Sequence, residues 1–339
     1  MIVMGIETSC DETSVSLVEN GRKVLANEVL SQIDIHQLYG GVVPEIASRE
    51  HVKGITLVFD QAITKAGISY RDIDLIAVTA GPGLIGSLLI GVNAAKVISL
   101  NYHIPMLGIQ HIAGHIYANQ LENEMEFPLL ALVVSGGHTE LILMHGHFEF
   151  QKLGETQDDA VGEAYDKIAR ILGLPYPGGP RIDALAQTGM DTYHFPRPML
   201  DSPDDNFSFS GLKSHVINSY HNHMQRGQTI HVPDFCRSFQ DAVTDVLVSK
   251  TLKAAQIHQV KQIIVAGGVA ANKGLREKMR STITDIPVYF PHIRYCTDNA
   301  AMIASAGYFK YQKTKQADDY MLNGASRLDL IEKGDPTWQ

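Results

Sequence analysis

The feature that most constrains this fold is a pattern that occurs twice along the chain. A short apolar run at 2–6 is followed by a small polar turn, a second apolar run, the turn Asn20-Gly21 and a third run. The same order of strand, polar turn, strand, glycine turn and strand returns at 129–153. Asn-Gly between two such runs is a strong hairpin signal. A repeat of this kind predicts two related α/β lobes, each built on its own sheet.

The length of the chain agrees with two lobes, because 339 residues exceed what one ordinary small domain needs. The contents of 45% hydrophobic and 19% charged residues are typical of ordered globular proteins. We expect a first lobe at 1–121 plus about 294–325, and a second lobe at about 127–293. An acidic connector at 122–126 separates them in the sequence.

Apolar periodicity predicts further helices and strands around these repeats. Pro44 is well placed to open a helix that continues to Ala66, because proline is tolerated at the first helical position. The sequence predicts loops at 176–180 and, as an irregular stretch, at 189–212. The other expected elements are strands at 73–79, 105–109, 262–266 and 287–290, and helices at 87–100, 158–172, 234–258 and 300–311.

Nothing in the composition indicates export or membrane insertion. The N-terminal segment is not basic and reaches Glu7 too soon for a signal peptide. No run approaches the roughly 18 apolar residues that span a membrane. Cys10, Cys236 and Cys296 are odd in number and scattered, which indicates free thiols in a reducing compartment. We therefore expect a cytoplasmic protein that does not bind membranes.

Net charge restricts the partners of this chain. At −9 with neutral histidines, the chain as a whole disfavours nonspecific binding to nucleic acid. A nucleic-acid substrate would therefore need a local basic patch or partner proteins. The candidate contributors to such a patch are Arg49, Lys53, Lys167, Arg170, Arg181 and Lys213.

Three turns that follow apolar strands consist of small and polar residues, at 7–13, 135–139 and 267–272. Glycine beside serine or threonine lets backbone N–H groups approach an anion, and a following helix adds its positive end. Neither GxxxxGK[ST] nor GxGxxG fits at these places. The sequence therefore predicts phosphate or nucleotide binding without a P-loop or a Rossmann motif.

His111 and His115 stand four residues apart in a segment expected to be helical. That spacing places two imidazoles on one face of a helix, where they can share a metal ion. Asp298 is the best candidate for a third ligand, although, taken alone, it is better explained as the N-cap of the helix that follows it. Two histidines and one carboxylate suit Fe(II) or Zn(II) and leave positions open for a substrate oxygen. The rival carboxylates are Asp166 and Asp183.

The histidine spacing is also that of zinc peptidases, but one residue argues against this activity. Those enzymes need a glutamate directly after the first histidine to activate the attacking water. Ile112 stands at that position. Because no neighbouring group supplies the base, the sequence disfavours a peptidase.

A series of motifs occurs in one order along almost the whole chain. They are GIETSCDET at 5–13, YGGVVPE at 39–45, AGPG at 80–83, HIAGH at 111–115, VSGGHT at 134–139, YPGGP at 176–180, FSFSGLK at 207–213, AGGVAAN at 266–272 and CTDNA at 296–300. In this combination the chain resembles the bacterial TsaD family, the tRNA threonylcarbamoyladenosine transferases. The resemblance covers about residues 2–325.

The resemblance implies an actin-like ATPase (ASKHA) fold, with duplicated α/β lobes around a nucleotide cleft. It implies transfer of the threonylcarbamoyl group from threonylcarbamoyl-AMP to N6 of adenosine 37, in tRNAs that read codons beginning with A. The product is t6A, and AMP is released. The implied cofactors are one Fe(2+) or Zn(2+) ion per subunit and a nucleotide, either threonylcarbamoyl-AMP or an ATP/ADP-like ligand. The implied partners are tRNA and the TsaB and TsaE proteins.

The resemblance also assigns residues. The metal ligands of the family match His111, His115 and Asp298. Relatives often carry a second histidine directly before the first ligand, where this chain has Gln110. The two ligands are still present, but the resemblance does not say whether residue 110 supports the metal site in this chain. The substrate contacts of the family match Val134, Ser135, Gly136, Gly137, His138, Asp166, Gly179, Asp183 and Asn272.

Three questions stay open at this level. Asp11 and Glu12 are candidates for the base that takes the N6 proton, although both could instead bind backbone within their turn. An actin-like scaffold or regulatory subunit would bind ATP without any chemistry of its own. A sugar or small-acid kinase of the same fold would phosphorylate a small hydroxylated substrate, and would not depend on His111 or His115.

Overall fold

The computed structural model describes residues 1–331, and the chain divides into two compact units. Unit 1 consists of Met1–Met125, Gly146–Phe150 and the described residues from Pro291 onward, and unit 2 consists of Glu126–His145 and Gln151–Phe290. The division expected from the sequence does not anticipate the short segment Gly146–Phe150, which connects two strands of unit 2 but belongs to unit 1.

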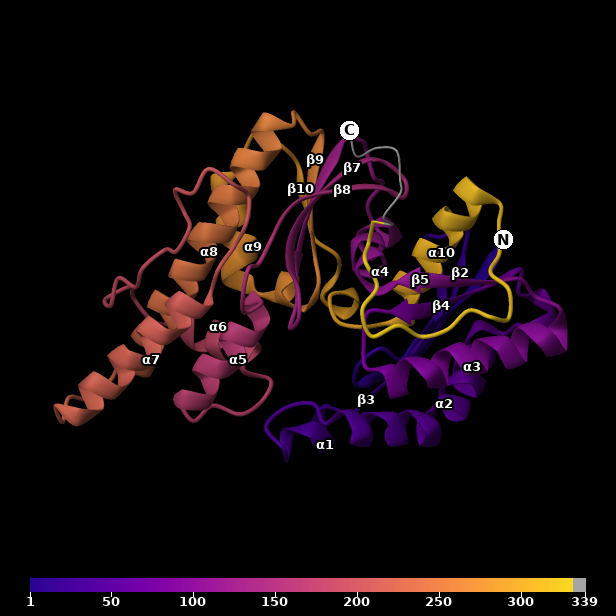
Figure 1. The fold of residues 1–339 in the computed structure, drawn as a ribbon, viewed down its shortest axis with the longest axis horizontal. Coiled ribbons are helices and arrows are strands. Elements are labelled where there is room, and N and C mark those ends of the chain that lie inside the picture. Colours follow the sequence, from indigo (N-terminus) through magenta and orange to yellow (C-terminus); the bar gives the residue numbers. More distant parts are fainter. Residues whose placement is uncertain (332–339) are drawn as a thin grey trace. The chain divides into compact units, whose positions relative to one another are not determined.

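Unit 1 is built on a five-stranded sheet of order β3-β2-β1-β4-β5. Figure 1 labels its strands β2, β3, β4 and β5. Strand β1 pairs antiparallel with β2 and parallel with β4. Asn20 and Gly21, at φ values of 53° and 71°, turn β2 into β3, which confirms the predicted hairpin. The strands are β1 Ile2–Glu7, β2 Glu12–Glu19, β3 Lys23–Ser31, β4 Leu75–Gly81 and β5 Met106–Gln110.

Unit 2 contains a second five-stranded sheet, of order β10-β9-β6-β7-β8. Its strands are β6 Leu129–Val134, β7 Thr139–Gly146, β8 Glu149–Glu155, β9 Gln262–Ala266 and β10 Val288–Tyr289. Strand β6 pairs antiparallel with β7 and parallel with β9, as β1 does with β2 and β4. Both sheets therefore have the same topology, which confirms the predicted duplication of one α/β lobe.

Helices cover both faces of the first sheet. Met4 and Ile6 of β1 join a buried core with side chains of two helices, α2 and α3. Gly5, between them, lies against the backbone of a third helix, α10, at Ala300. Because successive residues of a strand face opposite sides, α2 and α3 cover one face and α10 covers the other. The helices of unit 1 are α1 Ile33–Gln37, α2 Pro44–Ala66, α3 Ile85–Tyr102, α4 His111–Tyr117 and α10 Ala300–Thr314, with 3-10 turns at Tyr70–Asp72, Asn119–Leu121 and Ile293–Tyr295.

The helices of unit 2 are α5 Val161–Ile171, α6 Gly178–Ala186, α7 Ser210–Gln225, α8 Val232–Ile257 and α9 Lys273–Thr282, with a 3-10 turn at Gly268–Ala271. The loop expected at 176–180 is wrong after Pro177, because Gly178 begins α6. The Asp166 carboxylate accepts a hydrogen bond from the Gly178 N–H at 2.7 Å, which stabilises a helix start that is rich in glycine. The sequence predicted neither α7 nor α9.

Among residues 1–331, α3 is the one helix that is long and apolar enough to cross a membrane by length and composition. Its 18 residues have a mean hydropathy of 1.2, and 33% of them are buried. Helices in the cores of globular proteins pass the same test, so this is weak evidence for a membrane span. One side of α3 packs in the core of unit 1 through Val92 and Ala95.

Candidate functional site

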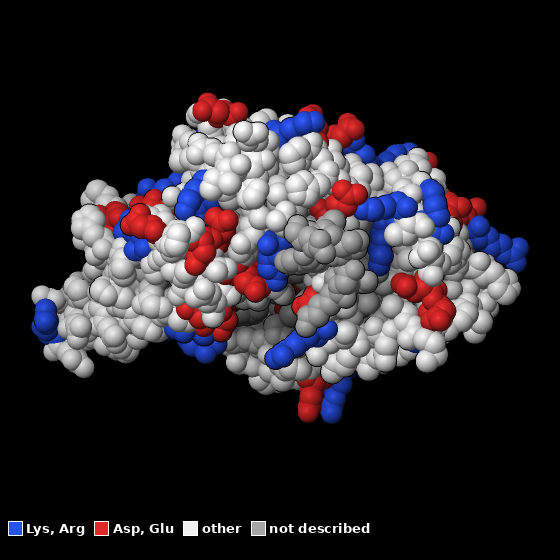
Figure 2. Space-filling view, turned by 45° about the horizontal axis from the view of Figure 1, so that its top comes forward, with Lys and Arg blue, Asp and Glu red and all other residues white. Residues whose placement is uncertain are grey.

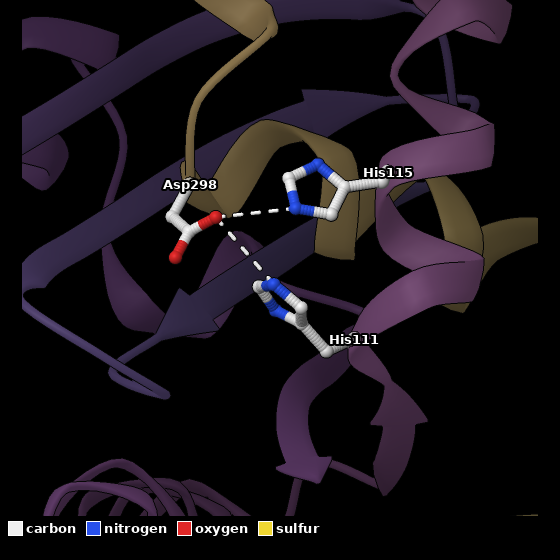
Figure 3. Close-up of side chains that lie close together, drawn as sticks. All are labelled: His111, His115 and Asp298. Carbon is white, nitrogen blue, oxygen red and sulfur yellow. Dashed lines mark ion pairs between the residues drawn. The ribbon is translucent and has the colours of Figure 1, made fainter. Parts of the chain in front are cut away.

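His111, His115 and Asp298 converge within unit 1 (Figure 3). The two imidazoles project from α4, and the carboxylate projects from the segment just before α10. Oδ1 of Asp298 lies 3.2 Å from Nε2 of His115 and 3.5 Å from Nε2 of His111. The structure therefore brings together the three residues that the sequence singled out as metal ligands.

The spacing of these atoms fits a single ion. A metal about 2.0–2.2 Å from each ligand atom keeps neighbouring ligand atoms about 3.0–3.5 Å apart. The separations of 3.2 Å and 3.5 Å fall in that range, and all three ligand atoms lie within 4.8 Å of one another. Within residues 1–331, this is the one group of three or more His, Cys, Asp or Glu residues that could hold a metal.

The short helix α4 presents both histidines. Strand β5 ends at Gln110, whose side-chain Oε1 accepts a hydrogen bond from the Ala113 N–H at 2.9 Å and so caps the helix. The four-residue spacing then places His111 and His115 on one face. Gly114 permits close packing on α10, because a side chain there would collide with Ile303.

Asn299, and not Asp298, caps α10. Oδ1 of Asn299 accepts a hydrogen bond from the Met302 N–H at 3.2 Å, and its Nδ2 donates to the Thr297 carbonyl at 2.8 Å. The alternative in which Asp298 is the N-cap is therefore wrong. The Asp298 carboxylate faces the two imidazoles instead.

Glu7, at the end of β1, orients His111. Its Oε2 lies 3.1 Å from Nδ1 of His111 and accepts a hydrogen bond from the Thr79 hydroxyl at 2.7 Å. Because a carboxylate accepts hydrogen bonds, this contact places a hydrogen on Nδ1 and leaves Nε2, on the side of Asp298, as the nitrogen that can bind a metal once it gives up its proton. Nδ1 of His115, by contrast, is buried without a hydrogen-bond partner among the described residues. The sequence placed Glu7 in a polar turn but gave no sign that it would reach a histidine.

The opposite charges in this cluster shift each other's proton affinity. Burial lowers the pKa of His111, but the carboxylates of Asp298 and Glu7 outweigh burial and raise that pKa well above its usual value. Burial acts to raise the pKa of Asp298, but the two histidines hold it well below its usual range. A proton and a metal ion therefore compete for Nε2 of His111.

Asp11 and Glu12, the two candidates for a base, lie in the same unit and are 8% and 9% exposed. Burial raises the pKa of Glu12 well above its usual value, and the negative charges of Asp11 and Asp298 raise it further. The Ser31 hydroxyl donates to Glu12 at 3.3 Å and opposes this shift. The structure thus places Glu12 within electrostatic range of the metal ligands.

In unit 2, the predicted turn 135–139 connects β6 to β7. The Ser135 N–H donates to the His138 carbonyl at 2.8 Å, and the His138 N–H donates to Oγ of Ser135 at 3.1 Å. Gly136 and Gly137 are exposed, and no atom lies within 4 Å of the place where a Cβ would be. Among the described residues nothing accepts a hydrogen bond from their N–H groups. The turn therefore presents two open backbone donors.

Two other segments lie against this turn. Gly267, at φ 90°, has no room for a side chain, because the Val134 carbonyl lies against it. The Gly162 N–H, near the start of α5, donates to the Ser135 carbonyl at 3.1 Å. Further along α5, Asp166 accepts hydrogen bonds from the N–H groups of Gly178 and Gly179, while burial raises its pKa. Most of the predicted substrate-binding residues therefore lie around the start of α5.

Asp183 and Asn272 hold the start of α9. Asp183 accepts hydrogen bonds from the N–H groups of Lys273, at 2.9 Å, and Gly274, at 3.2 Å. Asn272 caps the helix by accepting from the Leu275 N–H at 2.8 Å. Both side chains are thus engaged within the protein, which is the bond pattern of residues that position a turn.

Gln240 connects these two residues, and the sequence did not single it out. It is 2% exposed, and its Nε2 donates to Asp183 at 3.1 Å. Its Oε1 accepts from Nδ2 of Asn272 at 2.8 Å and from the Tyr165 hydroxyl at 3.4 Å. A lone glutamine in the long helix α8 carries no motif, so only the fold reveals its role.

Comparison with known proteins finds one family that matches most of the chain. Residues 23–305 match the family model of TsaD, tRNA N6-adenosine threonylcarbamoyltransferase. The tRNA N6-adenosine threonylcarbamoyltransferase of Bacillus subtilis strain 168 is 57% identical over 333 residues, covering 97% of this chain and 96% of that protein.

Two solved structures support the expected two-lobed actin-like ATPase fold. HypF of T. kodakarensis is similar with a TM-score of 0.64 at 13% identity, over 92% of this chain and 48% of that one. Component A of the (R)-2-hydroxyglutaryl-CoA dehydratase of Acidaminococcus fermentans is similar with a TM-score of 0.56 at 14% identity, over 92% and 99% of the two chains. At these identities the likeness concerns the fold alone. On the match to the family model and the identity to its members, the chain belongs to the family of tRNA N6-adenosine threonylcarbamoyltransferases.

Proposed function

We propose that this chain, a transferase by its family, moves the threonylcarbamoyl group of threonylcarbamoyl-AMP to N6 of adenosine 37, in tRNAs that read codons beginning with A. The adenosine amine attacks the carbamoyl carbon, a C–N bond forms, and the bond from that carbon to the phosphate oxygen breaks. AMP leaves and the N6 proton passes to a base. The observation that carries the proposal is the convergence of His111, His115 and Asp298 in a member of this family.

The donor set fits one divalent ion, Fe(2+) or Zn(2+), held by His111, His115 and Asp298. When bound, the ion supplies a Lewis acid that stabilises negative charge on the oxygens of the donor. Glu7 fixes the tautomer and the orientation of His111 through their 3.1 Å contact. The buried carboxylates nearby make the electrostatic potential at these three residues negative, which favours a cation there.

Of the two candidate bases, we propose Glu12. A useful base has a pKa near the working pH, and burial raises the pKa of Glu12 above its usual value. The bond from Ser31 holds its carboxylate in place. We assign proton transfer from N6 to Glu12, with Asp11 as the neighbour that supports the raised pKa.

The open turn of unit 2 suits the phosphate of an adenylate or of another nucleotide. Gly136 and Gly137 present free N–H groups, and Ser135 and His138 fix the turn that carries them. Such backbone donors bind anionic oxygens well. We propose that Val134 to His138 bind the ligand, with Asp166 and Gly179 at its edge, and that Asp183 and Asn272 position the adjoining turn.

The charges of the chain support a need for partners in tRNA binding. Figure 2 shows Lys and Arg side chains interspersed with Asp and Glu on the face in view. Three of the six candidate cations are ion-paired: Lys53 with Glu50, and Lys167 and Lys213 with Asp159. We propose that TsaB and TsaE proteins assist tRNA binding, and that the chain acts in the cytoplasm.

The test is formation of t6A. The purified chain is supplied with tRNA, threonine, bicarbonate, ATP, the upstream adenylate-forming enzyme and the partner proteins, and position 37 is analysed. We expect t6A together with AMP, and loss of both in His111→Ala. Absence of t6A under these conditions would refute the transferase. ADP release with a phosphorylated small molecule would identify a kinase instead, and binding of ATP without turnover would identify a scaffold.

A further inference from the structure

The side chain of Gln110 connects the histidine-bearing helix to the C-terminal part of unit 1. Its Oε1 caps α4 through the Ala113 N–H at 2.9 Å, and its Nε2 donates to the Leu328 carbonyl at 3.2 Å. A carboxamide holds its acceptor and its donor in one rigid plane. The position of the Leu328 carbonyl therefore restricts the direction in which Oε1 faces the helix.

Residues 316–328, here called the C-terminal strap, supply that carbonyl. The strap begins after Lys315, which ends α10 in the left-handed conformation at φ 53°. The Asp318 N–H donates to the Met106 carbonyl at 2.8 Å, and Oδ2 of Asp318 accepts from the Gly108 N–H at 2.7 Å. Since β5 is the last strand of its sheet, the strap satisfies backbone groups on an edge that the other strands leave open.

The strap is also held at the end of β4. The Ala325 N–H donates to the Ala80 carbonyl at 2.7 Å, and the Ala325 carbonyl lies against Gly81, where a side chain would collide with it. Leu322 packs against the buried core of unit 1. Contacts with β5 and with the end of β4 hold the strap in place up to Leu328. The carbonyl of Leu328 then accepts a hydrogen bond from Gln110, the last residue of β5.

We infer that Gln110 is a positioning residue of the metal centre, and that the C-terminal strap sets the start of α4 through it. This inference rests on the metal site proposed above. The Leu328 carbonyl fixes the Gln110 amide, the amide fixes the Ala113 N–H, and the same helical turn carries His111. A loosened first turn would let Nε2 of His111 move away from Asp298. Groups that orient metal ligands in this way typically change metal affinity by about 10–100-fold.

Four variants separate the two bonds of Gln110. Gln110→Glu keeps an acceptor for the Ala113 N–H but has no N–H to donate to Leu328. Gln110→Ala removes both bonds. Removal of 327–339 deletes the Leu328 carbonyl and leaves the contacts of Asp318 and Ala325 in place. Removal of 332–339 is the matched control, because it shortens the C-terminus and keeps Leu328.

The first readout is affinity for Zn(2+), by competition with a chromophoric chelator. We expect Gln110→Glu and removal of 327–339 each to weaken Zn(2+) binding about tenfold. Combining them should cause no further loss, because both delete the same bond. The control truncation should bind like the full chain. Unchanged affinity after removal of 327–339, or losses that multiply in the combined variant, would overturn the inference.

The second readout is hydrogen exchange at the Ala113 amide in the metal-free protein. We expect faster exchange in Gln110→Ala and after removal of 327–339, and unchanged exchange in the control truncation. Because this measurement needs no metal, it tests the strap even if the full chain fails to bind Zn(2+). Failure to bind Zn(2+) would refute the proposed metal site but not the contact between the strap and Gln110. Unaltered exchange after removal of 327–339 would show that the strap does not act through Gln110.

Discussion

Oε2 of Glu7 lies 3.1 Å from Nδ1 of His111, and this contact leaves the other ring nitrogen to face Asp298. Glu7 is fully buried and comes from the first strand of the chain, whereas the histidine comes from α4. The carboxylate is in turn held by the Thr79 hydroxyl. Glu7 ends β1, Thr79 lies near the end of β4, and His111 follows the last residue of β5. The surroundings of His111 thus come from three neighbouring strands of one sheet.

Substitution of Glu7 tests this contact. Glu7→Gln replaces a charged acceptor with a neutral one, so Nε2 of His111 becomes a weaker ligand. We expect Zn(2+) binding to weaken by about tenfold or more. Glu19→Gln is the matched control, because Glu19 is an exposed partner of Lys23 in the same sheet. Equal affinities of the two variants for Zn(2+) would show that Glu7 does not support the ligand.

The raised pKa of His111 predicts a pH dependence of metal binding. The metal needs the deprotonated ring, and the proton stays on the ring up to a pH well above the usual pKa of histidine. Affinity should therefore fall with decreasing pH, by up to about tenfold per pH unit for one displaced proton. Titrations at pH 6, 7 and 8 measure this slope. A flat profile would mean that no proton leaves the site when the metal binds.

Asp298 and Asn299 should have separable effects. Asn299→Ala removes the cap of α10 and should lower the free energy of unfolding by about 1–2 kcal/mol, with the metal retained in the folded protein. Asp298→Asn should lose metal affinity and keep the cap. Urea denaturation and metal analysis of both variants check the pair. The assignment of the two roles fails if the stability loss follows Asp298 or the metal loss follows Asn299.

Gln240 should support the turn at 267–272. Gln240→Ala breaks its bonds to Asn272 and Asp183, and we expect unfolding to become easier by about 1–3 kcal/mol, with weaker binding of adenylate. Gln187→Ala is the control, since its Nε2 reaches the same Asp183 carboxylate at 3.4 Å. Calorimetry with AMP compares the two variants. If the two variants bind AMP with equal affinity, Gln240 does not support the ligand-binding site.

Much of the fold could be predicted from local signals. Helix α2 begins at Pro44 as expected, and the strand β9 has the predicted bounds. Helix α6 was missed because Gly178 and Gly179 are typical of a loop. The carboxylate that binds their N–H groups, Asp166, lies on the preceding helix α5, and no local pattern reveals this contact. Helix α7 was missed because its N-terminal residues lie within a stretch that has no clear apolar period.

The residues of the candidate site that belong to sequence motifs could be predicted from the sequence. The four-residue histidine spacing indicated a shared face, Asp298 was the best candidate for the third ligand, and the resemblance assigned the same three residues. No local signal distinguished Asp298 from Asn299 as the cap of α10, because both side chains favour that position. Glu7, Gln110 and Gln240 act through residues far away in the sequence, so their partners became visible only in the structure.

Metal analysis of the purified chain beside its Asp298→Ala variant tests the central claim most directly. We predict about one equivalent of Fe(2+) or Zn(2+) in the native chain, since its three ligands form one site. The variant should hold almost none, although it remains folded, and should form no t6A. A folded Asp298→Ala protein that keeps its full metal content would contradict the site built from His111, His115 and Asp298.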